Sequence, residues 1–150
     1  MAEVKAKVAN LIEQRKKLRE RFSREVTLQP ADISITPLDE KFLHRAIEVV
    51  EKNMNDEDFS FADLMEDMNM SRSTLFRKLH ALTDQSPTEF IRTLRLKRAA
   101  SLLKQNFGNV TQVSFEVGFS SLSYFNRSFK NLYGVSPAKY MKQNYIGIAR

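Results

Sequence analysis

A pattern of a short helix, a turn and a second helix occurs twice in this chain, about 50 residues apart. Residues 73–79 align with residues 123–129, and Ser86-Pro87 recurs as Ser136-Pro137. Before the turn the offset is 49, so the second copy carries one extra residue. Chance similarity between short amphipathic helices rarely preserves register, caps and a matched Arg together. The repeat therefore predicts two similar helical units.

Helix signals also fill the sequence around the repeat, and no alternating strand pattern competes with them. Ser86-Pro87-Thr88-Glu89 is a capping box with Pro at the first helical position, and it opens a long helix. Ser60 and Ser71 precede two further helices as N-caps. We predict an all-α protein. Its expected helices cover 37–53, 61–68, 72–82, 87–105, 110–117, 121–133 and 137–144.

Each copy of the repeat has the spacing of a helix-turn-helix. The first spans about 60–82 and the second about 109–133, and the helix over 87–105 joins them. In the second helix of each pair, apolar residues at i, i+4 and i+7 predict a buried face. These residues are Leu75, Leu79 and Leu82 in the first copy, and Phe125, Phe129 and Leu132 in the second.

The opposite faces of these two helices carry groups that can read DNA. Arg pairs bidentately with guanine, Asn pairs with adenine, and apolar side chains contact the thymine methyl group. Ser at a helix start can reach phosphates, helped by free N–H groups. The candidate DNA-binding residues on these faces are Ser73, Phe76, Arg77, His80, Ser123, Asn126, Arg127 and Lys130.

Other roles remain open for four of these residues. Phe76 could instead pack beside the core of its helix pair. Arg77 and Arg127 could form surface ion pairs, although their matched placement favours a shared function. We expect His80 to be solvated or to touch a phosphate, and not to bind a metal.

The charge is segregated along the chain. The overall charge is +6, yet residues 31–70 hold 3 basic and 11 acidic groups, and residues 71–150 hold 13 and 3. A basic half of this kind is typical of a protein that binds a polyanion. We expect the acidic segment to cover a face turned away from DNA.

The predicted helix over 87–105 would be about 28 Å long at 1.5 Å per residue. One turn of DNA is about 34 Å, so one chain could read two successive major-groove segments of double-stranded DNA. The basic residues of this helix are Arg92, Arg95, Lys97, Arg98 and Lys104. Some of them could approach phosphates, and others must support packing. The expected joint core is Leu94, Leu96, Ala99, Ala100, Leu102 and Leu103.

Two segments precede the predicted DNA-binding domain of residues 37–150. Residues 1–25 form a basic helical pattern with a short apolar seam, and residues 26–36, with Pro30, form a linker. Three turns of this seam have coiled-coil spacing, so we expect that the full-length protein can form a homodimer.

Several classes of protein do not fit this sequence. There is no Cys, so no thiolate zinc site or Cys nucleophile exists, and the two His are 36 residues apart. Neither a Gly-rich phosphate loop nor a nucleophile elbow occurs. We therefore expect no enzymatic activity, no cofactor and no metal. No apolar run could span a bilayer, and no signal peptide is present, so we expect a cytoplasmic protein without membrane contact.

The segment SPTEFIRTLRLKRAASLL, followed by VTQVSFEVGFSSLSYFNRSFKNLYGVSPAKYMK, resembles the DNA-binding domain of AraC/XylS transcription regulators. The resemblance covers about residues 38–143 and implies two helix-turn-helix subdomains that enter adjacent major grooves. Asn69 and Asp84 stand where the family often has Gly. The base-facing positions that it implies are Arg72, Ser73, Phe76, Arg77, Ser121, Leu122, Ser123, Asn126 and Arg127.

The N-terminal residues are similar to the junction in Bacteroidetes hybrid two-component regulators, where the last helix of a receiver domain leads into an AraC-type output domain. Residues 1–25 would then be the end of a receiver domain or a junction helix, and the receiver itself would lie outside this sequence. The association implies control of polysaccharide-utilisation genes. The alternative is a helical protein–protein interaction module that does not bind DNA.

Overall fold

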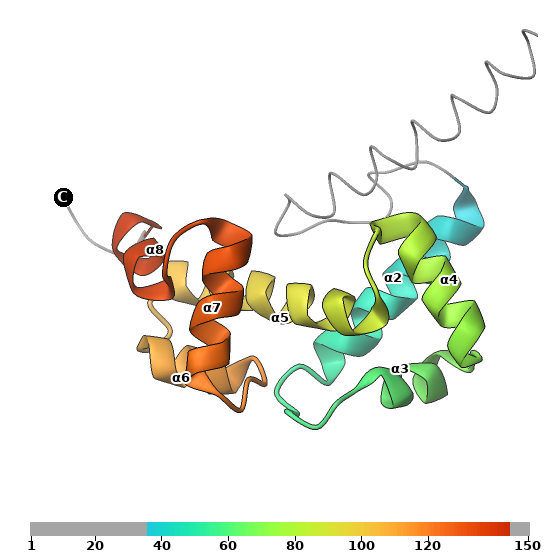
Figure 1. Cartoon of the computed structure of the whole chain (residues 1–150), viewed down its shortest axis with the longest axis horizontal. Coiled ribbons are helices and arrows are strands. Elements are labelled where there is room, and N and C mark those ends of the chain that lie inside the picture. Colours follow the sequence, from blue (N-terminus) through green and yellow to red (C-terminus); the bar gives the residue numbers. More distant parts are fainter. Residues whose placement is uncertain (1–35, 145–150) are drawn as a thin grey trace, which may run out of the picture. The chain divides into compact units, whose positions relative to one another are not determined.

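The structure is a computed structural model that describes residues 36–144, and this part is helical without strands (Figure 1). The predicted helix over 1–25 and almost all of the linker over 26–36 lie outside the described residues. The all-α prediction is confirmed. The helices are α2 (Pro37–Lys52), α3 (Phe61–Met68), α4 (Arg72–Thr83), α5 (Pro87–Lys104), α6 (Val110–Glu116), α7 (Leu122–Tyr133) and α8 (Pro137–Asn144).

The described chain divides into two compact units, and each contains one helix-turn-helix pair. The first unit holds residues 36–49 and Phe61–Phe90, which include most of α2, all of α3 and α4, and the first turn of α5. The second unit holds Val50–Ser60 and residues 91–144, with the rest of α5 and α6 to α8. The two copies of the repeat therefore lie in two different compact units.

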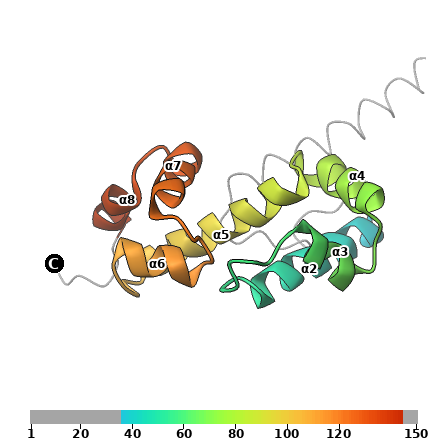
Figure 2. The same ribbon diagram turned by 60° about the horizontal axis from the view of Figure 1, so that its bottom comes forward.

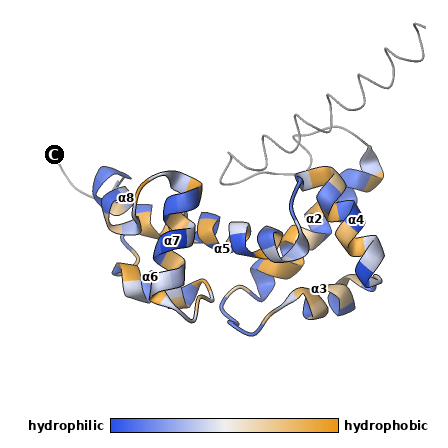
Figure 3. Cartoon of the chain, in the orientation of Figure 1, coloured by the Kyte–Doolittle hydropathy of each residue, from blue (hydrophilic) through white to orange (hydrophobic). Residues whose placement is uncertain are grey.

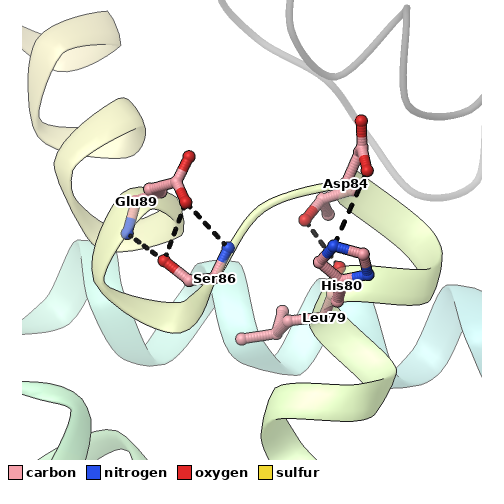
Figure 4. Close-up of polar contacts among 6 residues, drawn as sticks. Leu79, His80, Asp84, Ser86 and Glu89 are labelled. Atoms are coloured by element: carbon pink, nitrogen blue, oxygen red, sulfur yellow. Dashed lines mark hydrogen bonds and ion pairs between the residues drawn. The ribbon is translucent and has the colours of Figure 1, made fainter.

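Side-chain hydrogen bonds cap the start of α4, α5 and α7. Ser86 Oγ accepts a hydrogen bond from the Glu89 N–H at 3.2 Å, and a Glu89 carboxylate oxygen accepts one from the Ser86 N–H at 3.5 Å (Figure 4). The predicted capping box at α5 is confirmed. Ser71 and Ser121 cap α4 and α7 by accepting from the backbone N–H three residues later. These bonds satisfy N–H groups that have no partner inside the helix.

The two residues that replace glycine keep the turn geometry that glycine usually supplies. Asn69, between α3 and α4, has φ 52°, and Asp84, after α4, has φ 58°. The corresponding positions in the second unit are Gly118 and Gly134, with φ 88° and 80°. Asn and Asp enter this left-handed region more readily than most residues. The first unit therefore forms the same turns without glycine.

The first unit buries the apolar faces of α2, α3 and α4 against one another. The helices are amphipathic, with hydrophobic and hydrophilic residues alternating along each ribbon (Figure 3). The predicted core face of α4 is confirmed, because Leu75, Leu79 and Leu82 are buried. The other large residues of this core are Phe42, Leu43, Val49, Leu64 and Phe90.

Aromatic rings form the core of the second unit, where α6, α7 and α8 group around the C-terminal part of α5 (Figure 2). Phe125 and Phe129 are fully buried, as predicted, whereas Leu132 is only half-buried. The Phe129 ring lies 5.8 Å from that of Phe125, 4.6 Å from Tyr133 and 5.2 Å from Tyr140. Burying a Phe or Tyr removes a large apolar area from water, so these rings supply much of the unit's stability.

The buried side of α5 contains the predicted core residues and two basic side chains. The six expected core residues Leu94, Leu96, Ala99, Ala100, Leu102 and Leu103 are all buried, which confirms that prediction. The basic residues of this helix were predicted either to approach phosphates or to support packing. Arg95 and Lys97 support packing, because only 6% and 4% of their surfaces are exposed. Both belong to the packed interior. None of the described helices has the length and apolar character needed to cross a membrane.

Candidate nucleic-acid interface

The exposed face of α4 carries all five residues that the sequence singles out in the first unit. Leu75 and Leu79 point into the core, so the residues between them point to solvent. The exposed residues are Arg72, Ser73, Phe76, Arg77 and His80. The structure thus brings a cationic, a hydroxyl and an aromatic group together on one helix face.

Phe76 does not pack into the core, because 45% of its surface is exposed. Its ring is parallel to that of His80 one turn later, with 6.1 Å between ring centroids and an interplanar angle of 6°. His80 Nε2 lies 3.8 Å from a carboxylate oxygen of Asp84 (Figure 4). The side chains of Phe76, His80 and Asp84 therefore form a row along one side of α4, and the apolar ring of Phe76 is exposed to solvent.

Two cations on α4 lie over aromatic rings. The guanidinium of Arg72 is 5.1 Å from the centre of the Phe61 ring, and the Lys78 ammonium is 5.3 Å from that of Phe42. Such contacts orient a cation without neutralising its charge. Arg77 makes no ion pair with any residue of the described range 36–144. The ion-pair alternative for Arg77 therefore has no support there.

The exposed face of α7 repeats this arrangement in the second unit. Ser121 is the N-cap residue and is exposed, and Leu122 is half-buried. The remaining predicted residues, Ser123, Asn126, Arg127 and Lys130, are all exposed, whereas Phe125 and Phe129 are buried on the other side. The free N–H groups at the start of α7 lie beside these side chains, which suits phosphate binding.

Tyr124 also belongs to this surface, although the sequence analysis did not select it. It lies on α7 and is 41% exposed, and its hydroxyl accepts a hydrogen bond of 3.0 Å from Nη1 of Arg92 on α5. Arg92 was one of the basic residues expected either to approach phosphates or to support packing. Sequence patterns could not reveal this bond, because its partners are 32 residues apart.

Buried Arg95 fixes the turn between α6 and α7. Its Nη1 donates to the carbonyl oxygens of Met54 and Val117, both at 2.8 Å, and its Nη2 donates to that of Asp56 at 2.8 Å. Burial lowers the pKa of the Arg95 guanidinium, and the Asp56 carboxylate partly offsets this effect. The guanidinium thus joins α5, the loop after α2 and the end of α6.

Gly118 leaves the room that this guanidinium needs. A Cβ at Gly118 would collide with Nη1 of Arg95 and come within 2.5 Å of the Met54 carbonyl oxygen. Its φ of 88° also lies in the region that other residues rarely adopt. Gly118 and Arg95 together set the turn that precedes α7, and so the place where the second exposed face begins.

The charge around these helices is strongly positive. Residues 71–144 contain twelve basic and three acidic side chains. The acidic residues concentrate instead in the loop after α2 and on α3, where Asp56, Glu57 and Asp58 are exposed. Within residues 36–144, no group of three His, Asp or Glu side chains is placed to hold a metal ion. The candidate site is therefore a cationic surface.

These features define a protein with two helix-turn-helix units, each of which exposes a polar, cationic face on its second helix. A family model described as a helix-turn-helix domain matches residues 64–143. The chain belongs to this family, and within it to the AraC type, as its relatives and structural neighbours show. The resemblance to AraC/XylS regulators is thereby confirmed.

Two curated relatives and one solved structure illustrate the similarity. Histidine kinase P4 of Formosa agariphila is 38% identical over 141 residues, which are 94% of this chain and 10% of that protein. The HTH-type transcriptional regulator MtrA of Neisseria gonorrhoeae is 32% identical over 105 residues, which are 70% of this chain and 34% of that protein. The chain thus spans a minor part of each relative.

The solved structure is a transcriptional regulator from Chromobacterium violaceum that its description assigns to proteins with an AraC-type DNA-binding domain. It superimposes with a TM-score of 0.67 at 26% identity, covering 75% of this chain and all of that one. The chain is therefore the DNA-binding domain of an AraC-type transcription regulator.

Proposed function

We propose that this chain is the sequence-specific, double-stranded DNA-binding output domain of a two-component signalling protein. The observation that carries the proposal is the matched pair of exposed faces on α4 and α7. Each face holds an Arg at the same position of the repeat, Arg77 and Arg127, opposite a fully buried core. A packed core alone explains the buried faces but not the matched cationic ones.

Each unit would place its second helix in one major-groove segment, so that one chain reads two successive segments. Arg77 and Arg127 would pair with guanine, Asn126 with adenine, and Phe76 would contact a thymine methyl group. The remaining residues would bind phosphates or support these contacts; they are Arg72, Ser73, His80, Ser121, Leu122, Ser123 and Lys130. No cofactor and no catalytic step enter this function.

The signalling context rests on similarity to a relative named as a histidine kinase, which extends well beyond the matched residues. In the proposed protein, residues 1–25 are the end of a receiver domain or a junction helix. Residues 26–36 link them to the DNA-binding domain of residues 37–150, and the full-length chain acts as a cytoplasmic homodimer. Polysaccharide-utilisation genes are the proposed targets, on the resemblance to hybrid regulators alone.

Titration with duplex DNA at two salt concentrations tests the proposed function. Each phosphate that the protein neutralises releases counterions, so the affinity of a protein with six or more contacts falls about a thousandfold from 50 to 200 mM salt. An affinity that barely changes would contradict DNA binding and favour a protein–protein interaction module. Selection of bound duplexes from a random pool then identifies the preferred sequence.

A further inference from the structure

Tyr124 occupies a particular place on the second exposed face. It lies three residues before Arg127 on α7, so the two side chains are neighbours on the helix surface. Although it is aromatic, 41% of its surface is exposed, and the proposed function assigns it no contact.

The Tyr124 ring is held from two sides. The ring of buried Phe119 lies 5.7 Å away at an interplanar angle of 54°. Nη1 of Arg92, a half-buried residue of the scaffold helix α5, donates to the Tyr124 hydroxyl at 3.0 Å. Tyr has only two side-chain torsions, so these two contacts are enough to fix its orientation.

Arg127 lies against this fixed ring. Its guanidinium carbon is 6.0 Å from the centre of the Tyr124 ring, at the outer limit of a cation–π contact. No carboxylate within residues 36–144 forms an ion pair with Arg127. The ring is therefore the neighbour that restricts where the guanidinium points, and all of its N–H donors remain available.

The first unit has no aromatic residue at the matching position. The residue 50 positions before Tyr124 is Thr74, whose hydroxyl accepts a hydrogen bond of 2.9 Å from Ser71 Oγ at the cap of α4. Arg77, the counterpart of Arg127, has no ring contact within the described residues. The two units therefore differ in how they hold otherwise equivalent arginines.

We propose that Tyr124 is a positioning residue for base recognition, whose ring, tethered by Arg92, orients the guanidinium of Arg127 toward the O6 and N7 atoms of a guanine. The inference rests on the proposed function and names the base that the second unit reads through this residue. An arginine that is oriented before binding loses less rotamer freedom on contact, which improves discrimination between bases.

Discrimination is measured as the ratio of dissociation constants for a selected duplex and for one changed at a single base pair. The informative base pair is the one whose preference is lost in Arg127→Ala. Tyr124→Leu removes the ring, whereas Tyr124→Phe keeps the ring and removes only the tether to Arg92. Arg92→Met removes the same tether from the other side. Circular dichroism and the melting temperature establish that each variant is folded.

Tyr124→Leu is expected to lower discrimination at this base pair about two- to fivefold, the range of an exposed cation–π contact. Discrimination at base pairs that depend on Arg77 should stay unchanged. Tyr124→Phe and Arg92→Met should each give a smaller loss, and together no more than either alone. In the Arg127→Ala background, Tyr124→Leu should have no further effect on discrimination.

Three results would overturn the inference. Uniform weakening by Tyr124→Leu on all duplexes would make Tyr124 a phosphate contact. Additive losses with Arg127→Ala would show that Tyr124 acts independently. Unchanged discrimination in Tyr124→Leu, with the wild type still selective, would refute this inference and leave the proposed function intact. A wild type without any base preference would instead refute the proposed function itself.

Discussion

Replacing the buried Arg95 gives the most quantitative test of how the second unit is held together. Arg95→Met keeps an unbranched apolar stem, although a shorter one, and removes the guanidinium. Two hydrogen bonds at 2.8 Å to the carbonyls of Met54 and Val117 are then lost inside the protein. The bond to Asp56 is lost in a partly buried place, so water can replace it.

Each buried carbonyl left without a partner costs about 1–3 kcal/mol. Two such groups give about 2–6 kcal/mol, and losing one partner of a buried charged contact typically costs about 3–5 kcal/mol. The net loss of stability is smaller than this sum, because the variant no longer has to desolvate a guanidinium. That cost is visible in the lowered pKa of Arg95, since burial disfavours its charged form. We expect Arg95→Met to reduce the free energy of unfolding by about 2–5 kcal/mol.

Intrinsic Tyr fluorescence during urea unfolding measures this change in the second unit alone. All four Tyr residues lie within residues 91–150, and the chain has no Trp. Arg98→Met is a matched control, since Arg98 lies on the same helix but is exposed; it should change stability by less than about 0.5 kcal/mol. A loss below about 1 kcal/mol in Arg95→Met would refute the structural role given to its hydrogen bonds.

Three further tests concern local features, all by denaturant unfolding. Gly118→Ala should destabilise the protein more than Gly134→Ala, because a Cβ meets Arg95 at the first position and open space at the second; equal losses would contradict this account. Asp84→Gly should be neutral and Asp84→Ala should cost about 1 kcal/mol, because residue 84 has φ 58°. A harmless Asp84→Ala would argue against that conformation. Tyr133→Phe should be neutral or slightly stabilising at pH 7, because its buried hydroxyl has no hydrogen-bond partner among residues 36–144. Burial raises the pKa of Tyr133, so the folded protein resists ionisation of this hydroxyl. Its contribution to the free energy of unfolding is fully present below about pH 10 and is lost as the pH rises further. The decrease in stability at high pH should therefore be smaller in Tyr133→Phe.

The sequence predicted the helices of the described region well, because their limits depend on local chemistry. A serine caps the start of each of three helices, by accepting a hydrogen bond from the backbone N–H three residues later. These serines are Ser71, Ser86 and Ser121, and the spacing is visible in the sequence. The buried and exposed faces of α4 and α7 likewise follow from helical periodicity. The ends of the predicted helices consequently differ from the observed ones by only a residue or two.

Features that depend on tertiary contacts were not predictable in this way. Arg95 is charged in the sequence, and only the fold shows that four carbonyl oxygens accept hydrogen bonds from it. Tyr124 and Arg92 meet across two helices, so no periodicity connects them. The left-handed turns at Asn69 and Asp84 were also hidden, because neither residue type requires that conformation.

The claim that both exposed faces read DNA is tested most directly by selecting duplexes with the wild type and then measuring base preference in Arg77→Ala and Arg127→Ala. Each variant is expected to lose about 1–3 kcal/mol of specific binding and to relax the preference for a different base pair, one in each half of the selected sequence. Equal weakening by both variants on every duplex, with no change in base preference, would contradict recognition by these two faces.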